Sequence, residues 1–194
     1  MKKLLITAIT AAFFGLNAEI VNSNGDFEKC KADKAGNLMP EGWGINKGLS
    51  KKFTLTMVKD KEDVHSGNFA METETEGSGT LFLINWNAIP VKTGDTLKFT
   101  IHAKGEGTFR IGYLMYGVPE GAKNSVFLWT VASKGMKPVE GEYKQFTYTA
   151  KISPLIKNKK LHHKVSAYPV LIIDKNSNIL LDDLVVDLTK APGK

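Results

Sequence analysis

The sequence predicts an all-β protein, a β-sandwich with Greek-key or jelly-roll connections. Segments of about five to ten residues with alternating or aliphatic character recur along the chain, and Gly, Asn, Asp and Pro separate them. They follow one another at intervals of roughly ten to fifteen residues, a spacing that suits a sandwich. No stretch keeps a helical period, so helices are not expected. The chain has 194 residues, 42% of them hydrophobic, which is enough for one domain with a sizeable core.

The first 18 residues are expected to be a signal peptide. Lys2 and Lys3 precede an apolar run over residues 4–16, and Asn17-Ala18 follow. The run is short of the roughly twenty residues that span a bilayer, although a membrane anchor is the alternative. We therefore expect cleavage after Ala18, a mature domain over residues 19–194 without a membrane span, and a secreted, periplasmic or cell-surface location.

Cysteine content and charge exclude some other classes. Cys30 is the only cysteine, so an internal disulfide is impossible and stability must come from the core and any bound metal. Loss of Lys2 and Lys3 lowers the number of basic residues from 26 to 24 against 20 acids, a formal charge of +4. One basic cluster lies at residues 157–164, and we interpret it as a solvated loop. Nucleic acid is not an expected partner.

The expected strands contain many aliphatic, aromatic and β-branched residues. In chain order they cover residues 19–21, 53–58, 68–73, 80–86, 96–103, 108–116, 125–132, 144–152, 167–173 and 180–187. Turn chemistry supports several of their ends, because Gly94 in Lys92-Thr-Gly-Asp95 and the glycines of Lys104-Gly-Glu-Gly107 can adopt the positive φ that tight turns need. Residues 29–50 and 136–143 are expected to be ordered loops.

The last expected strand has two adjacent acids, Asp182 and Asp183, inside an aliphatic run. Successive side chains of a strand point to opposite faces, so one carboxylate must point inward, where an unpaired charge is costly. A Lys or Arg, a nest of donors or a hard cation such as calcium could neutralise it. A second acid-bearing segment, residues 24–28, opens the mature chain and is expected beside the last strand.

Several short motifs occur in a fixed order along the chain. They are Asn24-Gly-Asp-Phe-Glu28, Pro40-Glu-Gly-Trp43, Val64-His-Ser-Gly-Asn-Phe-Ala70, Val91-Lys-Thr-Gly-Asp95 leading into residues 97–105, and Leu180-Leu-Asp-Asp-Leu-Val-Val186. Together they cover nearly the whole mature chain. In this order and spacing the chain resembles the carbohydrate-binding modules of the family 4, 9, 16 and 22 group. The resemblance implies the galactose-binding-like jelly-roll fold.

The same resemblance implies a structural calcium ion that ties together the first strand, the loop before Ser66-Gly67 and the last strand. The implied ligand set is Glu28 and one of Asp182 and Asp183, the backbone near Asp26 and His65, and the carboxylate of Asp63. Glu28 and one of the paired acids would bind through their side chains, because calcium takes about six to eight hard oxygens. The alternative is that Asp183 faces solvent and Asp182 meets a lysine.

Sugar sites stack the apolar faces of sugar rings on aromatic side chains and hold the hydroxyls with polar groups. Trp86 lies between two asparagines at a strand end, as either a sugar platform or a core residue would. Alternation places Arg110 and Tyr116 on one face of their strand, interpreted as a groove wall. Both faces of residues 125–131 are apolar, so periodicity does not orient Trp129. The candidate sugar contacts are Trp86, Asn85, Arg110, Tyr116 and Trp129.

We expect an exported module that binds a polysaccharide or glycan without cleaving it, beside a glycan-active enzyme or surface protein as partner. The sequence contains no nucleophile elbow, paired-histidine protease motif or phosphate loop. The alternative is a structural or adhesion protein, in which Trp86, Tyr116 and Trp129 would form a flat apolar patch. A glycan-active enzyme is a third reading and would need two carboxylates facing each other across a cleft.

Overall fold

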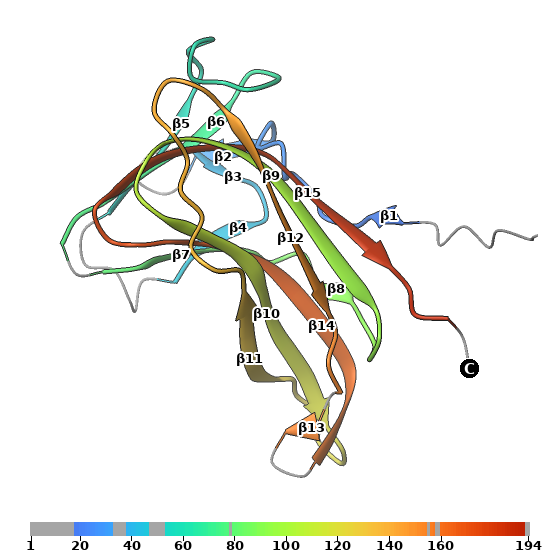
Figure 1. Cartoon of the computed structure of the whole chain (residues 1–194). Helices are drawn as coiled ribbons and strands as arrows, with labels where there is room; N and C mark the ends of the chain where they lie inside the picture. The colour runs from blue at the N-terminus through green and yellow to red at the C-terminus, as the bar shows by residue number, and fades with distance from the viewer. Residues whose placement is uncertain are drawn as a thin grey trace, which may run out of the picture.

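The computed structural model describes residues 18–32, 38–46, 53–77, 79–154, 156–157 and 160–192. The expected signal peptide therefore lies outside the described residues, apart from Ala18. The described residues form two large antiparallel sheets packed face to face, and none of them is in a helix (Figure 1). This arrangement confirms the predicted all-β sandwich. In the same residues, no helix is long and apolar enough to cross a membrane.

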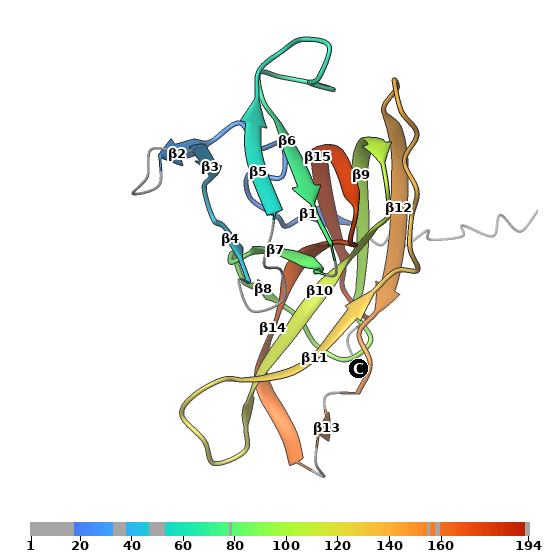
Figure 2. The same cartoon turned by 90° about the vertical axis from the view of Figure 1, so that its left-hand side faces the viewer.

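The first sheet has six strands. Its order is β12 (Lys144–Lys151), β9 (Thr96–Glu106), β15 (Ser177–Thr189), β6 (Ala70–Thr75) and β5 (Phe53–Val58), with β1 (Glu19–Ile20) also paired to β15. Figure 2 shows these strands side by side in the upper half of the view. The first and last of the described strands therefore pair, with Glu19 opposite Leu188.

The second sheet has seven strands. Its order is β11 (Val126–Ala132), β10 (Phe109–Pro119), β14 (Lys160–Ile173), β7 (Leu81–Asn85) and β4 (Trp43–Ile45). Two short strands, β8 (Ile89–Pro90) and β13 (Ile156–Lys157), also pair with β14, and β2 (Cys30–Ala32) forms a separate hairpin with β3 (Leu38–Pro40). Neighbouring strands in each sheet are often far apart in sequence, as in a jelly roll.

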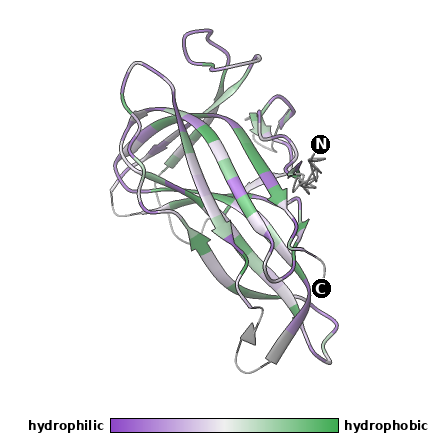
Figure 3. Cartoon of the chain, turned by 45° about the vertical axis from the view of Figure 1, so that its right-hand side comes forward, coloured by the Kyte–Doolittle hydropathy of each residue, from purple (hydrophilic) through white to green (hydrophobic). Residues whose placement is uncertain are grey.

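The main core fills the space between the sheets. Every second residue of a strand points into this core. In β9 the fully buried residues are Leu97, Phe99, Ile101 and Ala103, and the residues between them are not buried. Large side chains such as Phe27, and others from β10, complete it. Each fully buried large side chain contributes about 1.5–3 kcal/mol. Hydrophobic residues accordingly concentrate in the strands and hydrophilic ones in the loops (Figure 3).

All ten expected segments contain a strand, but two expected loops are partly wrong. Residues 29–50 include β2, β3 and β4, which are only three residues long and too short to show a period. The basic cluster at residues 157–164 includes the start of β14, because this strand extends along the far end of β10 and pairs His162 with Pro119. His162 is consequently buried rather than solvated.

Irregular strand pairing changes the direction of side chains at two places, one in β11 and one in β15. In β11 the register shifts between its pairings with Met115 and Tyr116 of β10, which leaves Leu128 as an extra residue. In β15 it shifts between Asp182 and Val185, and Asp183 there has a φ of 51°. A bulge reverses the alternation that the rest of the strand follows.

Candidate functional site: an aromatic groove on the second sheet

A groove of about 500 Å³ lies on the second sheet. Its lining residues come from β4, β7, β10 and β11 and from the positions just after β4 and β7: Ile45, Asn46, Phe82, Ile84, Trp86, Leu114, Tyr116, Phe127 and Thr130. Ile84 and Leu114 also belong, with Val170 and Ile172, to an apolar cluster separate from the main core. The sheet therefore has apolar side chains on both faces, and the groove is on the face turned away from the main core.

Four aromatic rings form a row across this face. The ring centroids of Trp86 and Tyr168 are 5.8 Å apart, those of Tyr168 and Tyr116 5.3 Å, and those of Tyr116 and Phe127 5.6 Å. All three contacts are edge to face, with interplanar angles of 62°, 80° and 67°. This geometry is favourable for aromatic pairs and fixes the rings before any ligand arrives. Trp86 and Phe127 at the two ends are 49% and 46% exposed.

The bulge in β11 places Phe127 in this row. Met115 of β10 pairs with Trp129, whereas the next residue, Tyr116, pairs with Phe127, so Leu128 is skipped. Leu128 and Trp129 both pack toward the main core, and Phe127 is returned to the groove face beside Tyr116. Strict alternation would have placed Phe127 and Trp129 on the same face.

Trp86 is held by the turn that follows β7. The backbone N–H of Trp86 donates to the Gly42 carbonyl at 2.7 Å. Asn85 is fully buried and shapes this turn: its Nδ2 donates to the Ser23 carbonyl at 2.9 Å, and its Oδ1 accepts from the N–H of Asn87 at 3.0 Å. The indole ring lies over Gly44, where an added Cβ would be 2.4 Å from the indole Nε1.

The structure brings together two of the five candidate sugar contacts, Trp86 and Tyr116. Asn85 is buried beneath the turn, and Trp129 packs against the main core. Arg110 lies six residues along β10 from Tyr116, about 20 Å away at the usual rise per residue, and pairs with Asp174 at 2.5 Å. Sequence reasoning missed Tyr168 and Phe127. Both lie in expected strands. The sheet face that Tyr168 takes depends on how β14 pairs with β10, and the face that Phe127 takes depends on the bulge in β11.

Replacing Gly44 with Ala tests how the tryptophan platform is positioned. Gly44 has no positive φ, so the backbone tolerates alanine, but the new methyl group would meet the indole ring of Trp86. We expect the ring to shift, with a change in tryptophan emission and little change in unfolding midpoint. Fluorescence and calorimetry of the same sample check this. Unchanged emission would contradict the position of Trp86.

The acidic residues near the other sheet gather around the loop between β5 and β6. Glu28 accepts from the N–H groups of Asn68 and Phe69 at 2.7 and 2.9 Å, and from Asn68 Nδ2 at 2.9 Å. Burial acts to raise the pKa of Glu28, but these hydrogen bonds outweigh it and leave the pKa below its ordinary value. Glu28 therefore stays ionised and fastens the start of the domain to this loop.

Asp182 is fully buried and held by backbone donors. Its Oδ2 accepts from the N–H groups of His65 and Ser66 at 2.9 and 3.1 Å, and its Oδ1 from the N–H of Asp183 at 2.7 Å. Burial raises the pKa of Asp182 to about 6 even though these donors act to lower it. Of the three ways to neutralise an inward acid, the structure uses the nest of donors. Asp182 faces the covering loop rather than the main core, because it pairs with His102, on the outer face of β9.

Among the described residues, the side chains implied as calcium ligands lie in one region but do not converge on one point. Asp63 pairs with Lys104 at 2.9 Å, and Asp26 makes only a 3.5 Å contact with the Glu28 N–H. In the described residues, the one group of three or more His, Cys, Asp or Glu side chains whose ligand atoms lie within 4.8 Å of one another is His65, His102 and Asp183. Two of its three ligands are nitrogens, whereas calcium takes oxygens. The side chains present do not fit calcium.

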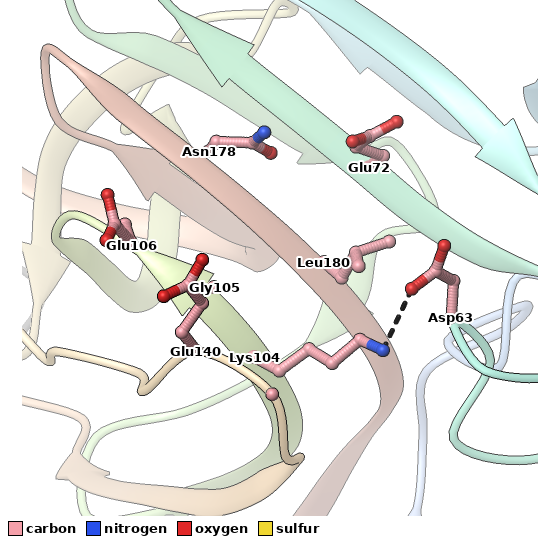
Figure 4. Close-up of a pocket in the computed structure, with 9 residues that line it drawn as sticks. Asp63, Glu72, Lys104, Gly105, Glu106, Glu140, Asn178 and Leu180 are labelled. Carbon is pink, nitrogen blue, oxygen red and sulfur yellow. Dashed lines mark hydrogen bonds and ion pairs between the residues drawn. The ribbon is translucent and has the colours of Figure 1, made fainter.

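A second hollow, of about 350 Å³, lies on the first sheet (Figure 4). Its lining includes three glutamates, Glu72, Glu106 and Glu140, and the ion pair between Lys104 and Asp63 lies at one side of it. If the protein were a glycan-active enzyme, the paired carboxylates that it needs would be expected in this hollow. Its lining, in the part of the chain that the structure describes, contains no aromatic ring, so it offers no platform for a sugar face.

No protein-family model matches the chain, and no curated protein matches it in sequence. Solved structures do match in fold. The CBM22-1 xylan-binding domain of Paenibacillus barcinonensis Xyn10C matches with a TM-score of 0.53 and 12% identity over 90% of this chain and 97% of that domain. A cyclase from Fischerella sp. TAU matches with a TM-score of 0.58 and 14% identity over 91% and 100%.

The enzymatically active domain of bacteriophage CBA120 tailspike protein 4 matches with a TM-score of 0.56 and 13% identity. The match covers 87% of this chain but only 21% of the tailspike chain. The three neighbours include a binding module and two enzymes, and all are below 15% identity, so the likeness establishes the fold and not the activity. The chain has the jelly-roll β-sandwich fold of the xylan-binding module, as its motifs implied.

Proposed function

We propose that the protein binds carbohydrate, without cleaving it, in the groove on the second sheet. The observation that carries this proposal is the row of four aromatic rings, Trp86, Tyr168, Tyr116 and Phe127. Sugar rings have apolar C–H faces that pack on aromatic rings, and a row suits a chain of sugars better than a single one. The xylan-binding neighbour shares the fold, which makes a sugar ligand the first choice to test.

The form of the surface supports a sugar ligand over a protein partner. Trp86, Tyr116 and Phe127 line a hollow of about 500 Å³, so the rings do not form a flat patch. Polar groups lie among them: Asn46 and Thr130 line the groove, and Tyr116 and Tyr168 carry hydroxyls. A ligand with many hydroxyls needs such donors and acceptors beside its apolar contacts. A protein-contact surface of this size would be flatter and more uniformly apolar.

The groove also lacks the groups that cleavage would require. Its lining, among the described residues, contains no acid, histidine or cysteine. Glycoside hydrolysis needs a proton donor and a second carboxylate on either side of the bond. A ligand seated on the four rings would therefore be held and not cut. The expected signal peptide supports action outside the cell, where a glycan-active enzyme or surface protein would be the partner.

A polysaccharide panel tests the proposal. The mature protein is run by affinity electrophoresis through gels that contain plant, microbial or animal polysaccharides, and each mixture is also assayed for new reducing ends. We expect retardation by one polysaccharide class with no reducing ends released. Release of reducing ends would move the assignment to an enzyme that uses the acidic hollow of Figure 4. No retardation by any polysaccharide from a folded sample would favour the protein-contact alternative.

A further inference from the structure

We propose that His65, His102 and Asp183 bind a transition metal ion of the zinc class and that the ion clamps the β5–β6 loop onto the first sheet. The three residues come from separate parts of the chain: the loop, β9 and the bulge of β15. The ligand atoms of all three lie within 4.8 Å of one another. Such a group assembles only when the loop is folded over the sheet, so metal binding and loop position are coupled.

The three side chains are already close together. The rings of His65 and His102 are stacked, with centroids 3.8 Å apart and planes 12° from parallel. Because a metal binds in the plane of an imidazole ring, the His65 ring must turn toward the ion when the ion binds. His65 Nδ1 lies 2.7 Å from Asp183 Oδ2. Tetrahedral zinc with bonds of about 2.0–2.1 Å holds its ligand atoms about 3.3 Å apart, so the pair needs to open by only about half an ångström. His65 is on a loop with its side chain 34% exposed, which leaves room for that movement.

One ring nitrogen of His102 has no hydrogen-bond partner among the described residues. This nitrogen is Nδ1, and it is buried. The other, Nε2, has only a 3.5 Å contact, to Gln145 Nε2. A buried imidazole nitrogen without a partner is available to bind a metal ion.

Neighbouring groups hold the other two ligands in place. Ser66 Oγ donates to Asp183 Oδ1 at 2.8 Å, which orients the carboxylate and leaves Oδ2 toward His65. The backbone of His65 and Ser66 is fixed by the buried Asp182. The ring of Tyr143 meets His65 edge on at 5.2 Å. Supporting contacts of this kind are typical of metal sites, because they orient the ligands before the ion binds.

The donor set selects the class of metal. Two imidazole nitrogens and one carboxylate oxygen suit zinc, cobalt, nickel or copper, and calcium and magnesium bind such a set poorly. Three protein ligands leave a fourth position open, and the exposure of His65 leaves it accessible to water. The site therefore differs in ligands and in metal from the calcium site that the motifs implied.

The test uses tag-free mature protein that has been freed of metal with a chelator and dialysed. Zinc chloride is titrated by isothermal calorimetry, and thermal unfolding is followed with zinc, with calcium and with neither. We expect one equivalent of zinc with a Kd of micromolar or below, an increase of several degrees in Tm with excess zinc, and no shift with calcium. A calcium shift without a zinc shift would overturn the proposal, as would the absence of saturable zinc binding.

Single substitutions locate the site. His65→Gln, His102→Gln and Asp183→Asn are each expected to weaken zinc binding by at least ten-fold. His163→Gln is the matched control, since His163 is exposed on β14, in the other sheet, and should bind zinc as the parent does. Equal affinity in all four variants would place zinc elsewhere and overturn the proposal.

X-ray absorption of the zinc-loaded parent protein keeps the test independent of how the variants fold. We expect scattering from two imidazole rings bound at about 2.0 Å. A spectrum with oxygen ligands and no imidazole contribution would overturn the assignment even if zinc binds.

Discussion

Replacing Trp86 with Ala is expected to weaken binding of the glycan ligand by about 30-fold or more. Trp86 is the largest ring of the row, is half exposed and covers Tyr168 at one end of the groove. Truncating a well-placed aromatic anchor at an interface costs about 2 kcal/mol or more, which corresponds to that ratio of dissociation constants. The loss is measured by calorimetric titration of the parent and variant proteins with an oligosaccharide from the polysaccharide that retards the protein in the gel.

The matched control for this loss is Ile20→Ala. Ile20 is also a large exposed apolar residue, 66% exposed, but it lies on β1 at the first sheet. We expect the control to bind like the parent protein and both variants to unfold near the parent midpoint. Equal affinity of Trp86→Ala and the parent would mean that the ligand binds outside the aromatic groove.

Replacing Gly112 with Ala is expected to lower the free energy of unfolding by about 3 kcal/mol. Gly112 lies in the middle of β10, opposite Ala132 of β11. A Cβ at this position would be 1.9 Å from the Val131 carbonyl oxygen and 2.7 Å from Ala132 Cα. Both are backbone atoms and cannot swing aside, so the two strands would have to separate. Because β11 carries Phe127, glycan binding should weaken as well. Urea unfolding followed by tryptophan emission measures the change.

Gly135→Ala is the control for the glycine substitution. Gly135 also lacks a positive φ, and the single atom that a Cβ would approach closely is the Thr108 methyl group, at 2.7 Å. That side chain can adjust, so we expect a loss below about 1 kcal/mol. If both variants unfold at the parent midpoint, the close approach of β10 and β11 is not present in solution.

Period-two alternation and aliphatic runs were enough to predict the fold. In β9, Leu97, Phe99 and Ile101 alternate with Lys98, Thr100 and His102, and the structure buries the first set. Glycine turns located several strand ends, because glycine adopts backbone conformations that other residues avoid. These are local signals, which is why a single sequence contains them.

The candidate groove was only half predictable, because it depends on pairing between distant strands. Trp86 and Tyr116 could be recognised by residue type and position, but the Tyr168 ring that links them lies on β14, whose register no local pattern determines. Phe127 reaches the groove through a bulge that skips Leu128. A one-residue shift reverses which face a side chain takes, and the sequence of β11 is apolar on both faces.

The acid pair in β15 illustrates the same limit. Its sequence required that one carboxylate be neutralised, and the structure does this with N–H groups of residues 65 and 66, more than a hundred positions away. Asp183 adopts a φ of 51° at the bulge and turns toward His65 on the same loop. Neither a bulge at this position nor a stacked pair of histidines has a sequence signature.

The measurement that tests the central claim most directly is a nuclear Overhauser experiment on the mature protein with a bound oligosaccharide. The four rings are the proposed platform, so sugar C–H protons should show intermolecular contacts with Trp86, Tyr168, Tyr116 and Phe127, and the order of contacts along the oligosaccharide should follow the order of the row. Contacts confined to residues of the first sheet, such as those around the acidic hollow, would contradict the assignment of the groove.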